Sequence, residues 1–116
     1  MNINELILQK IRQYLVHSFL YYQLDVSIIS DRNYDQICAD LAKLISDNSD
    51  KNFLPFHDLV NSSLDENSSG FSISKYPPEI VSAALHLLYQ TNYIDSMSFE
   101  TFLARFGYTS SEIKNA

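Results

Sequence analysis

Residues that form tight turns are scarce in this sequence, and this scarcity limits the folds open to it. The 116 residues include two glycines, Gly70 and Gly107, and three prolines. A β-sandwich or β-barrel needs a tight turn after each short strand, and such turns depend heavily on glycine and proline. We therefore expect an all-α fold, in which helices are joined by a few short loops.

The two glycines also exclude the common nucleotide-binding motifs. A dinucleotide-binding fingerprint and a phosphate-binding P-loop both need closely spaced glycines, which this chain lacks. The length suits one domain, since domains commonly have about 100–150 residues. With 46% hydrophobic and 19% charged residues, the chain has enough apolar material for a packed core. We therefore expect a single domain over residues 1–116.

The charge and the cysteine content limit the partners and the compartment. Eight Lys and Arg residues against fourteen Asp and Glu residues give a net charge of −6, which disfavours non-specific nucleic-acid binding. The single cysteine, Cys38, has no partner for an intrachain disulfide, which favours a reducing compartment. No apolar run reaches the ~20 residues that cross a bilayer, and the N-terminus lacks the order of a signal peptide. These features predict a cytoplasmic protein that does not enter a membrane.

The N-terminal part, residues 1–46, is predicted to form a helical hairpin. Apolar residues recur at helical spacing from residue 3 to about residue 23, which indicates one long helix. A second helix begins after Ser30 or Asp31, because either side chain can accept a hydrogen bond from the first turn. Its apolar positions also follow the helical period as far as Ile45.

The middle of the chain is less regular. Two polar stretches, residues 46–52 and 61–70, are predicted to be loops. Between them, residues 53–60 can form a short helix after Pro55. Residues 71–76 alternate apolar and polar side chains, so a brief strand is an alternative there.

The C-terminal part contains two further helices. Pro77 and Pro78 suit the first turn of a helix, where a missing N–H costs nothing. The last helix begins with Ser98 as its cap and ends at Gly107. We expect residues 53–108 to complete the core of a domain with four to five helices, and residues 109–116 to form a flexible tail.

The residues best suited to binding lie between the end of the first helix and the start of the second. They are three tyrosines, two aspartates and a histidine: His17, Tyr21, Tyr22, Asp31, Tyr34 and Asp35. Aromatic faces beside carboxylates suit a flat cationic ring, and a cation over a tyrosine face gains about 0.5–2 kcal/mol. The structural alternative is that the tyrosines pack in the core and Asp31 caps a helix.

The order and spacing of these residues resemble a known domain. Residues 14–45, which include Tyr-Tyr, a spacer with Asp, and then Ser-Asp-x-x-Tyr-Asp, are similar to the N-terminal Ia domain of NAD-dependent DNA ligases. In that family this domain closes over the nicotinamide mononucleotide half of NAD while a lysine on the next domain is adenylated. The resemblance implies that Tyr21, Tyr22, Asp31, Tyr34 and Asp35 contact NAD or nicotinamide mononucleotide. His17 lies where some members also have a histidine.

The chain departs from the ligases in two ways. It has no Lys-x-Asp-Gly motif, so it has no lysine to adenylate and is not a ligase by itself. Ser27 stands where ligases commonly have proline, which leaves the connector less rigid. We therefore assign no catalytic residue and lean against an enzyme, although a hydrolase acting on NAD would need only one well-placed carboxylate.

Two functions remain open. The first is a freestanding accessory or regulatory protein that binds NAD or nicotinamide mononucleotide, or docks on an NAD-using enzyme. The second is a small helical interaction module or inhibitor, of the kind encoded by phages and mobile elements, that has lost nucleotide binding. If the tyrosines serve a ligand, Tyr34→Ala and Asp35→Asn should abolish binding and barely change the melting temperature.

Other candidate sites are weaker. His57 and His86 have no Cys or His partners at metal-ligand spacing, so we predict no metal site. Ser72-x-x-Lys75 has the spacing of a serine acylase but lacks the companion motifs, which favours a polar loop. Cys38 is expected to be a buried, unreactive thiol on the apolar face of the second helix.

Overall fold

Helices account for all the regular structure that is described. The structure is a computed structural model that describes residues 2–51, 53–64, 73 and 75–114. Its α-helices are α1 (Ile3–Gln23), α2 (Asp31–Asp47), α3 (His57–Ser63), α4 (Pro78–Leu88), α5 (Phe99–Arg105) and α6 (Ser110–Lys114). A 3-10 turn at Ser49–Lys51 follows α2, and a π-helical turn at Tyr89–Tyr93 extends α4. These residues contain no β-strand, and the predicted all-α fold is confirmed.

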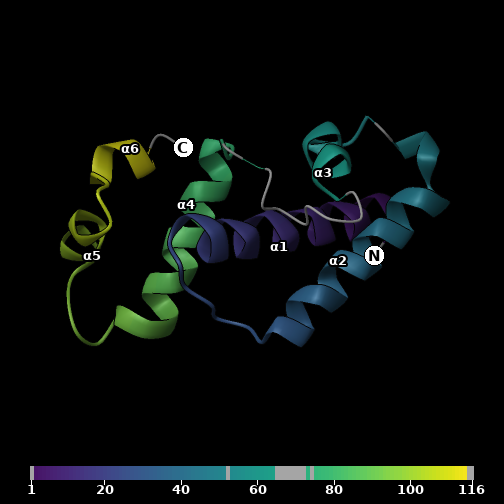
Figure 1. The fold of residues 1–116 in the computed structure, drawn as a ribbon. Helices are drawn as coiled ribbons and strands as arrows, with labels where there is room; N and C mark the ends of the chain where they lie inside the picture. The colour runs from purple at the N-terminus through teal and green to yellow at the C-terminus, as the bar shows by residue number, and fades with distance from the viewer. Residues whose placement is uncertain (1, 52, 65–72, 74, 115–116) are drawn as a thin grey trace.

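The long helix α1 lies at the centre of the molecule. It packs against α2, α3 and α4, while α5 and α6 pack at the outer side of α4 (Figure 1). The molecule is elongated, with principal extents of 44 × 29 × 28 Å. The core contains apolar side chains from all six α-helices, and the completely buried ones on α1 include Ile11, Leu15 and Leu20. The buried side chains of α1 therefore join the N-terminal and C-terminal halves of the chain.

Local hydrogen bonds fix the ends of the helices where the sequence predicted them. The Ser30 side chain accepts a hydrogen bond from the backbone N–H of Asn33 at 3.1 Å, so Ser30 and not Asp31 caps α2. The Ser98 side chain caps α5 in the same way, through the N–H of Thr101 at 3.2 Å. Gly107 follows α5 with φ = +84°, a conformation that favours glycine.

The turn after α1 uses a residue other than glycine. Asp25 has φ = +55°, in the left-handed region where aspartate is tolerated better than most residues. The N–H of Val26 then donates to the carbonyl of Leu20 at 2.9 Å, which closes the end of α1. Asp25 thus shapes the connector that leads to α2.

The C-terminal tail differs from the prediction. Residues 109–116 were expected to be flexible, but Ser110–Lys114 form α6, and Ile113 is 4% exposed. The prediction for the tail is corrected because Ile113 packs into the hydrophobic core and α6 lies against α4. The helix is too short for its apolar pattern to stand out in the sequence.

The middle of the chain agrees with the prediction only in outline. The short helix expected at residues 53–60 is α3, which begins four residues later and extends to Ser63, into the predicted loop. Part of the candidate strand at 71–76, residues 71, 72 and 74, lies outside the described residues. Ile73 and Tyr76 are both buried, so these two residues contribute apolar side chains to the core.

Candidate functional site

Four tyrosines from α1 and α2 form a continuous set of rings, which we call the tyrosine cluster: Tyr14, Tyr21, Tyr22 and Tyr34. The ring of Tyr34 lies between Tyr14 and Tyr21, with both centroids 6.3 Å away and interplanar angles of 20° and 14°. Tyr22 meets Tyr21 edge to face, with centroids 4.8 Å apart. The structure therefore brings the three predicted tyrosines together and adds Tyr14, which sequence reasoning did not select.

Hydrogen bonds anchor the inner side of the tyrosine cluster. The Tyr34 hydroxyl lies 2.7 Å from Oγ of Ser18 on α1. The Tyr14 hydroxyl lies 2.7 Å from Oγ of Ser63 on α3, and Ser63 donates its own proton to the carbonyl of Val60. Tyr14 is therefore the donor to Ser63. These bonds hold the inner rings in place, since a buried hydroxyl without a partner is costly.

The tyrosine cluster runs from the core to the surface. Tyr14 is fully buried, Tyr34 and Tyr22 are half-buried, and Tyr21 is 45% exposed. Burial, and then the nearby Tyr21, Cys38 and Asp35, raise the pKa of the Tyr22 phenol. Tyr22 is therefore a neutral phenol at physiological pH, and Tyr21 offers the most accessible ring.

Both predicted aspartates lie at the surface in the first part of α2. Asp31 and Asp35 are exposed, and neither forms an ion pair with the described part of the chain. Since Ser30 caps α2, the carboxylate of Asp31 is not used for that purpose. Asp35 lies close enough to Tyr22 to affect the pKa of its phenol. The exposed carboxylate of Asp35 therefore lies near the ring of Tyr22, and Asp31 is exposed about one turn earlier on α2.

His17 lies in another part of the surface. Its side chain lines a groove of about 330 Å³ between α1 and α4, together with Val16, Ala83 and Leu87, and does not stack with the tyrosines. Burial lowers the pKa of the His17 imidazole. The structure thus does not bring His17 together with the other predicted site residues, because its direction on α1 turns it toward α4.

Within the described ranges, no three His, Cys, Asp or Glu residues are grouped so that they could hold a metal ion. His57 is buried, with Nδ1 3.7 Å from a carboxylate oxygen of Asp58. Cys38 is half-buried beside the tyrosine cluster.

None of the helices described is both long and apolar enough to span a membrane.

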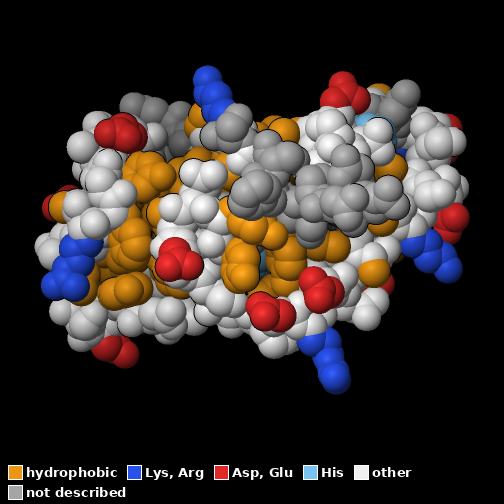
Figure 2. Space-filling view, in the orientation of Figure 1, with side chains coloured by type: hydrophobic (Ala, Val, Ile, Leu, Met, Phe, Trp, Pro, Cys, Tyr) orange, Lys and Arg blue, Asp and Glu red, His pale blue; other side chains and the backbone are white. Residues whose placement is uncertain are grey.

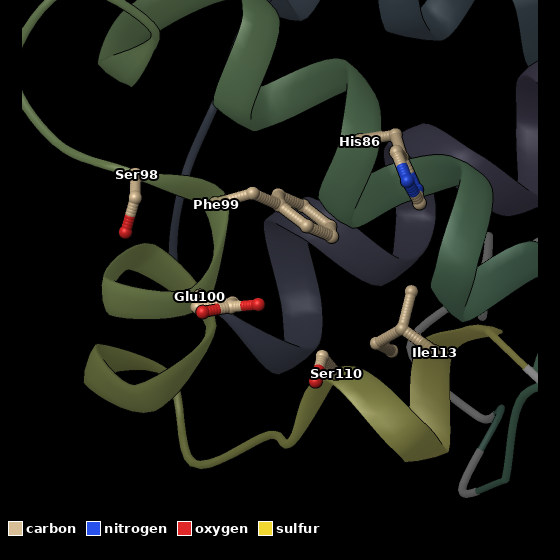
Figure 3. Close-up of a pocket in the computed structure, with 6 residues that line it drawn as sticks. All are labelled: His86, Ser98, Phe99, Glu100, Ser110 and Ile113. Carbon is tan, nitrogen blue, oxygen red and sulfur yellow. The ribbon is translucent and has the colours of Figure 1, made fainter.

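Sequence reasoning missed a groove between α4, α5 and α6, which we call the C-terminal groove. It has a volume of about 420 Å³ and is lined by His86, Ser98, Phe99, Glu100, Ser110 and Ile113 (Figure 3). The caps and the apolar pattern of α4 and α5 were visible in the sequence. The groove could not be predicted, because one of its walls is formed by α6, a helix that the sequence did not reveal.

Comparisons with known proteins do not assign the chain to a family. No protein-family model, curated protein or solved structure matches it significantly. The resemblance to the ligase Ia domain therefore stays a prediction from the sequence of residues 14–45.

Proposed function

We propose that this chain binds NAD or nicotinamide mononucleotide at the tyrosine cluster and acts as an accessory or regulatory module. The observation that carries the proposal is the exposed ring of Tyr21, which lies beside Tyr22 and Tyr34, with the carboxylate of Asp35 close to Tyr22. The absence of a Lys-x-Asp-Gly motif favours a binding role over ligation. The chain would present or hold the nucleotide, or dock on an enzyme that uses NAD.

The chemistry of nicotinamide mononucleotide suits these residues. Its oxidised ring is flat and cationic, so it can stack on the face of Tyr21, and the contact is worth about 0.5–2 kcal/mol. The carboxylate of Asp35 can offset the ring charge, while Asp31 can accept hydrogen bonds from the ribose hydroxyls. Arg32, exposed in the first turn of α2, can attract the phosphate.

The first experiment compares four ligands by amide chemical shifts in two-dimensional NMR. We expect nicotinamide mononucleotide and NAD to shift residues at the end of α1 and the start of α2, and AMP to shift them little. Reduced nicotinamide mononucleotide is the matched control, because its ring has the same outline but no positive charge. It should bind about 2- to 30-fold more weakly, which corresponds to the loss of 0.5–2 kcal/mol. No response to the oxidised ligands at millimolar concentration would exclude this function.

The structure also changes which variants test the site. The ring of Tyr34 packs against Tyr14 and its hydroxyl bonds to Ser18, so Tyr34→Ala is now expected to destabilise the fold. Tyr21→Leu and Asp35→Asn alter exposed side chains and should weaken binding without lowering the melting temperature. Asp47→Asn, at the far end of α2, is the control and should bind normally.

A separate observation favours the second function, protein interaction. The C-terminal groove lies on the outer side of α4, whereas the tyrosine cluster joins α1 and α2. A contact with another protein there would not need the tyrosine cluster, as expected of an interaction module that has lost nucleotide binding.

A further inference from the structure

The C-terminal groove combines an apolar wall with polar groups that accept hydrogen bonds. Figure 2 shows hydrophobic side chains gathered over the gap between α4 and the pair α5 and α6. In Figure 3 the rings of His86 and Phe99 lie together on one side, with Ile113 below His86 and Glu100 and Ser110 on the opposite side. The volume of about 420 Å³ lies within the range of ligand pockets, which is about 300–1,000 Å³.

The two rings form a fixed aromatic wall. Their centroids are 4.5 Å apart, with an interplanar angle of 32°. Nδ1 of His86 lies 2.8 Å from the carbonyl oxygen of Ser82, and since a carbonyl only accepts, Nδ1 carries the proton. In the neutral ring Nε2 is therefore a hydrogen-bond acceptor. Tyr89 meets the ring of Phe99 edge to face, with centroids 5.2 Å apart, and the Tyr89 hydroxyl donates to the carbonyl of Met97.

The charge in the C-terminal groove is negative. Glu100 is exposed, and it forms no ion pair with the described residues. Among the described residues that line the groove there is no lysine or arginine. An anionic ligand is disfavoured further, because Ser98 and Thr109 already accept hydrogen bonds from the first turns of α5 and α6. A cation with an apolar or planar part would fit these groups.

We propose that the C-terminal groove binds an arginine side chain from an exposed segment of a partner protein. A guanidinium group is planar, stacks on aromatic faces and forms a two-bond fork with a carboxylate, whereas a lysine ammonium is a compact point charge. It would stack on Phe99 and pair with Glu100, and its hydrocarbon stem would lie along Ile113. The net charge of −6 would favour approach of a basic partner surface.

The test is an NMR titration with blocked pentapeptides that carry one central residue among alanines and glycines. The central residue is arginine, lysine or citrulline, which has nearly the shape of arginine but no charge. We expect the arginine peptide to shift amides of α5 and α6, and the lysine peptide to bind at least fivefold more weakly. The citrulline peptide should show no saturable binding. Equal binding of the citrulline and arginine peptides would overturn the proposal.

Two variants locate the site. Glu100 and Glu79 both lie in the first turn of a helix, so Glu100→Gln and Glu79→Gln change the net charge and the helix ends equally. We expect Glu100→Gln to lose at least tenfold in affinity for the arginine peptide and Glu79→Gln to retain it. Equal losses, or shifts confined to the aspartates of α2, would overturn the proposal. Circular dichroism would confirm that both variants fold. Because the nucleotide test reads the end of α1 and the start of α2, either proposal can fail without the other.

Discussion

Tyr14 is the innermost ring of the tyrosine cluster, and its hydroxyl is completely enclosed. It donates to Oγ of Ser63 and so ties α1 to α3. Burial is the main reason that the pKa of the Tyr14 phenol rises from the ordinary 10.0 to about 12. This hydroxyl therefore stabilises the fold, while Tyr21 of the same cluster is 45% exposed.

This burial predicts a loss of stability at alkaline pH. The folded protein keeps the phenolic proton of Tyr14 up to about pH 12, whereas the unfolded chain releases it near pH 10. The free energy of unfolding should therefore fall as pH rises between these values, and this one group should contribute about 1.4 kcal/mol per pH unit. Urea titrations at pH 9, 10 and 11 would measure the slope.

Tyr14→Phe provides the control for this group. At pH 7 the variant should lose about 1 kcal/mol, the net value of one hydrogen bond, because Ser63 loses its donor. Between pH 10 and 12 its stability should fall less steeply than that of the unmodified chain. Parallel slopes for the two proteins would show that another group governs the alkaline transition.

At the scale of elements, the start of α2 positions most of the proposed nucleotide site. Ser30 caps this helix, and its first turn or turns carry Asp31, Tyr34 and Asp35. Replacing the cap should fray the turn and move these side chains together. The cap thus links local stability to ligand binding.

We predict that Ser30→Ala lowers the free energy of unfolding by about 1 kcal/mol, within the range of about 0.5–2 for lost N-caps. It should also weaken binding of nicotinamide mononucleotide, since the first turn of α2 becomes less ordered. Asp31→Asn is the control for stability, because Ser30 still caps the helix. Urea unfolding of both variants checks the prediction, and an equal loss of stability would show that Asp31 also contributes to the cap.

The helices with a clear apolar spacing or a clear capping residue were predicted most accurately. α1 and α4 were expected from their apolar spacing, and Ser98 and Gly107 marked the ends of α5. These signals depend on contacts among residues three or four apart, so they can be read without the tertiary structure. α6 was missed because five residues carry little periodicity.

At the scale of the whole molecule, α4 connects the two candidate sites. It packs against α1 and against α6. Ile113 on α6 belongs to the same hydrophobic core as the buried residues of α1. We therefore expect one cooperative unfolding transition for the chain, as is usual for single domains of this size.

Ile113→Ala tests this connection. Removal of a large buried side chain should cost about 2–5 kcal/mol, and tyrosine fluorescence and far-ultraviolet circular dichroism should shift together in urea. Ile94→Ala is the matched control, because Ile94 is 53% exposed and its loss should cost less than about 0.5 kcal/mol. A variant that loses circular dichroism first, with the fluorescence change delayed, would show that α6 unfolds separately.

The all-α class, the main helices and most of their caps could be predicted from the sequence, because these depend on interactions between near neighbours in the chain. The sequence also selected Tyr21, Tyr22 and Tyr34, but it did not select Tyr14, which stacks on Tyr34. The packing of the helices was needed to show that Tyr34 is held by Ser18 while Tyr21 stays exposed, that His17 turns toward α4, and that α6 completes a groove. These features depend on which helix faces pack together, because they arise from contacts between residues that are far apart in the chain.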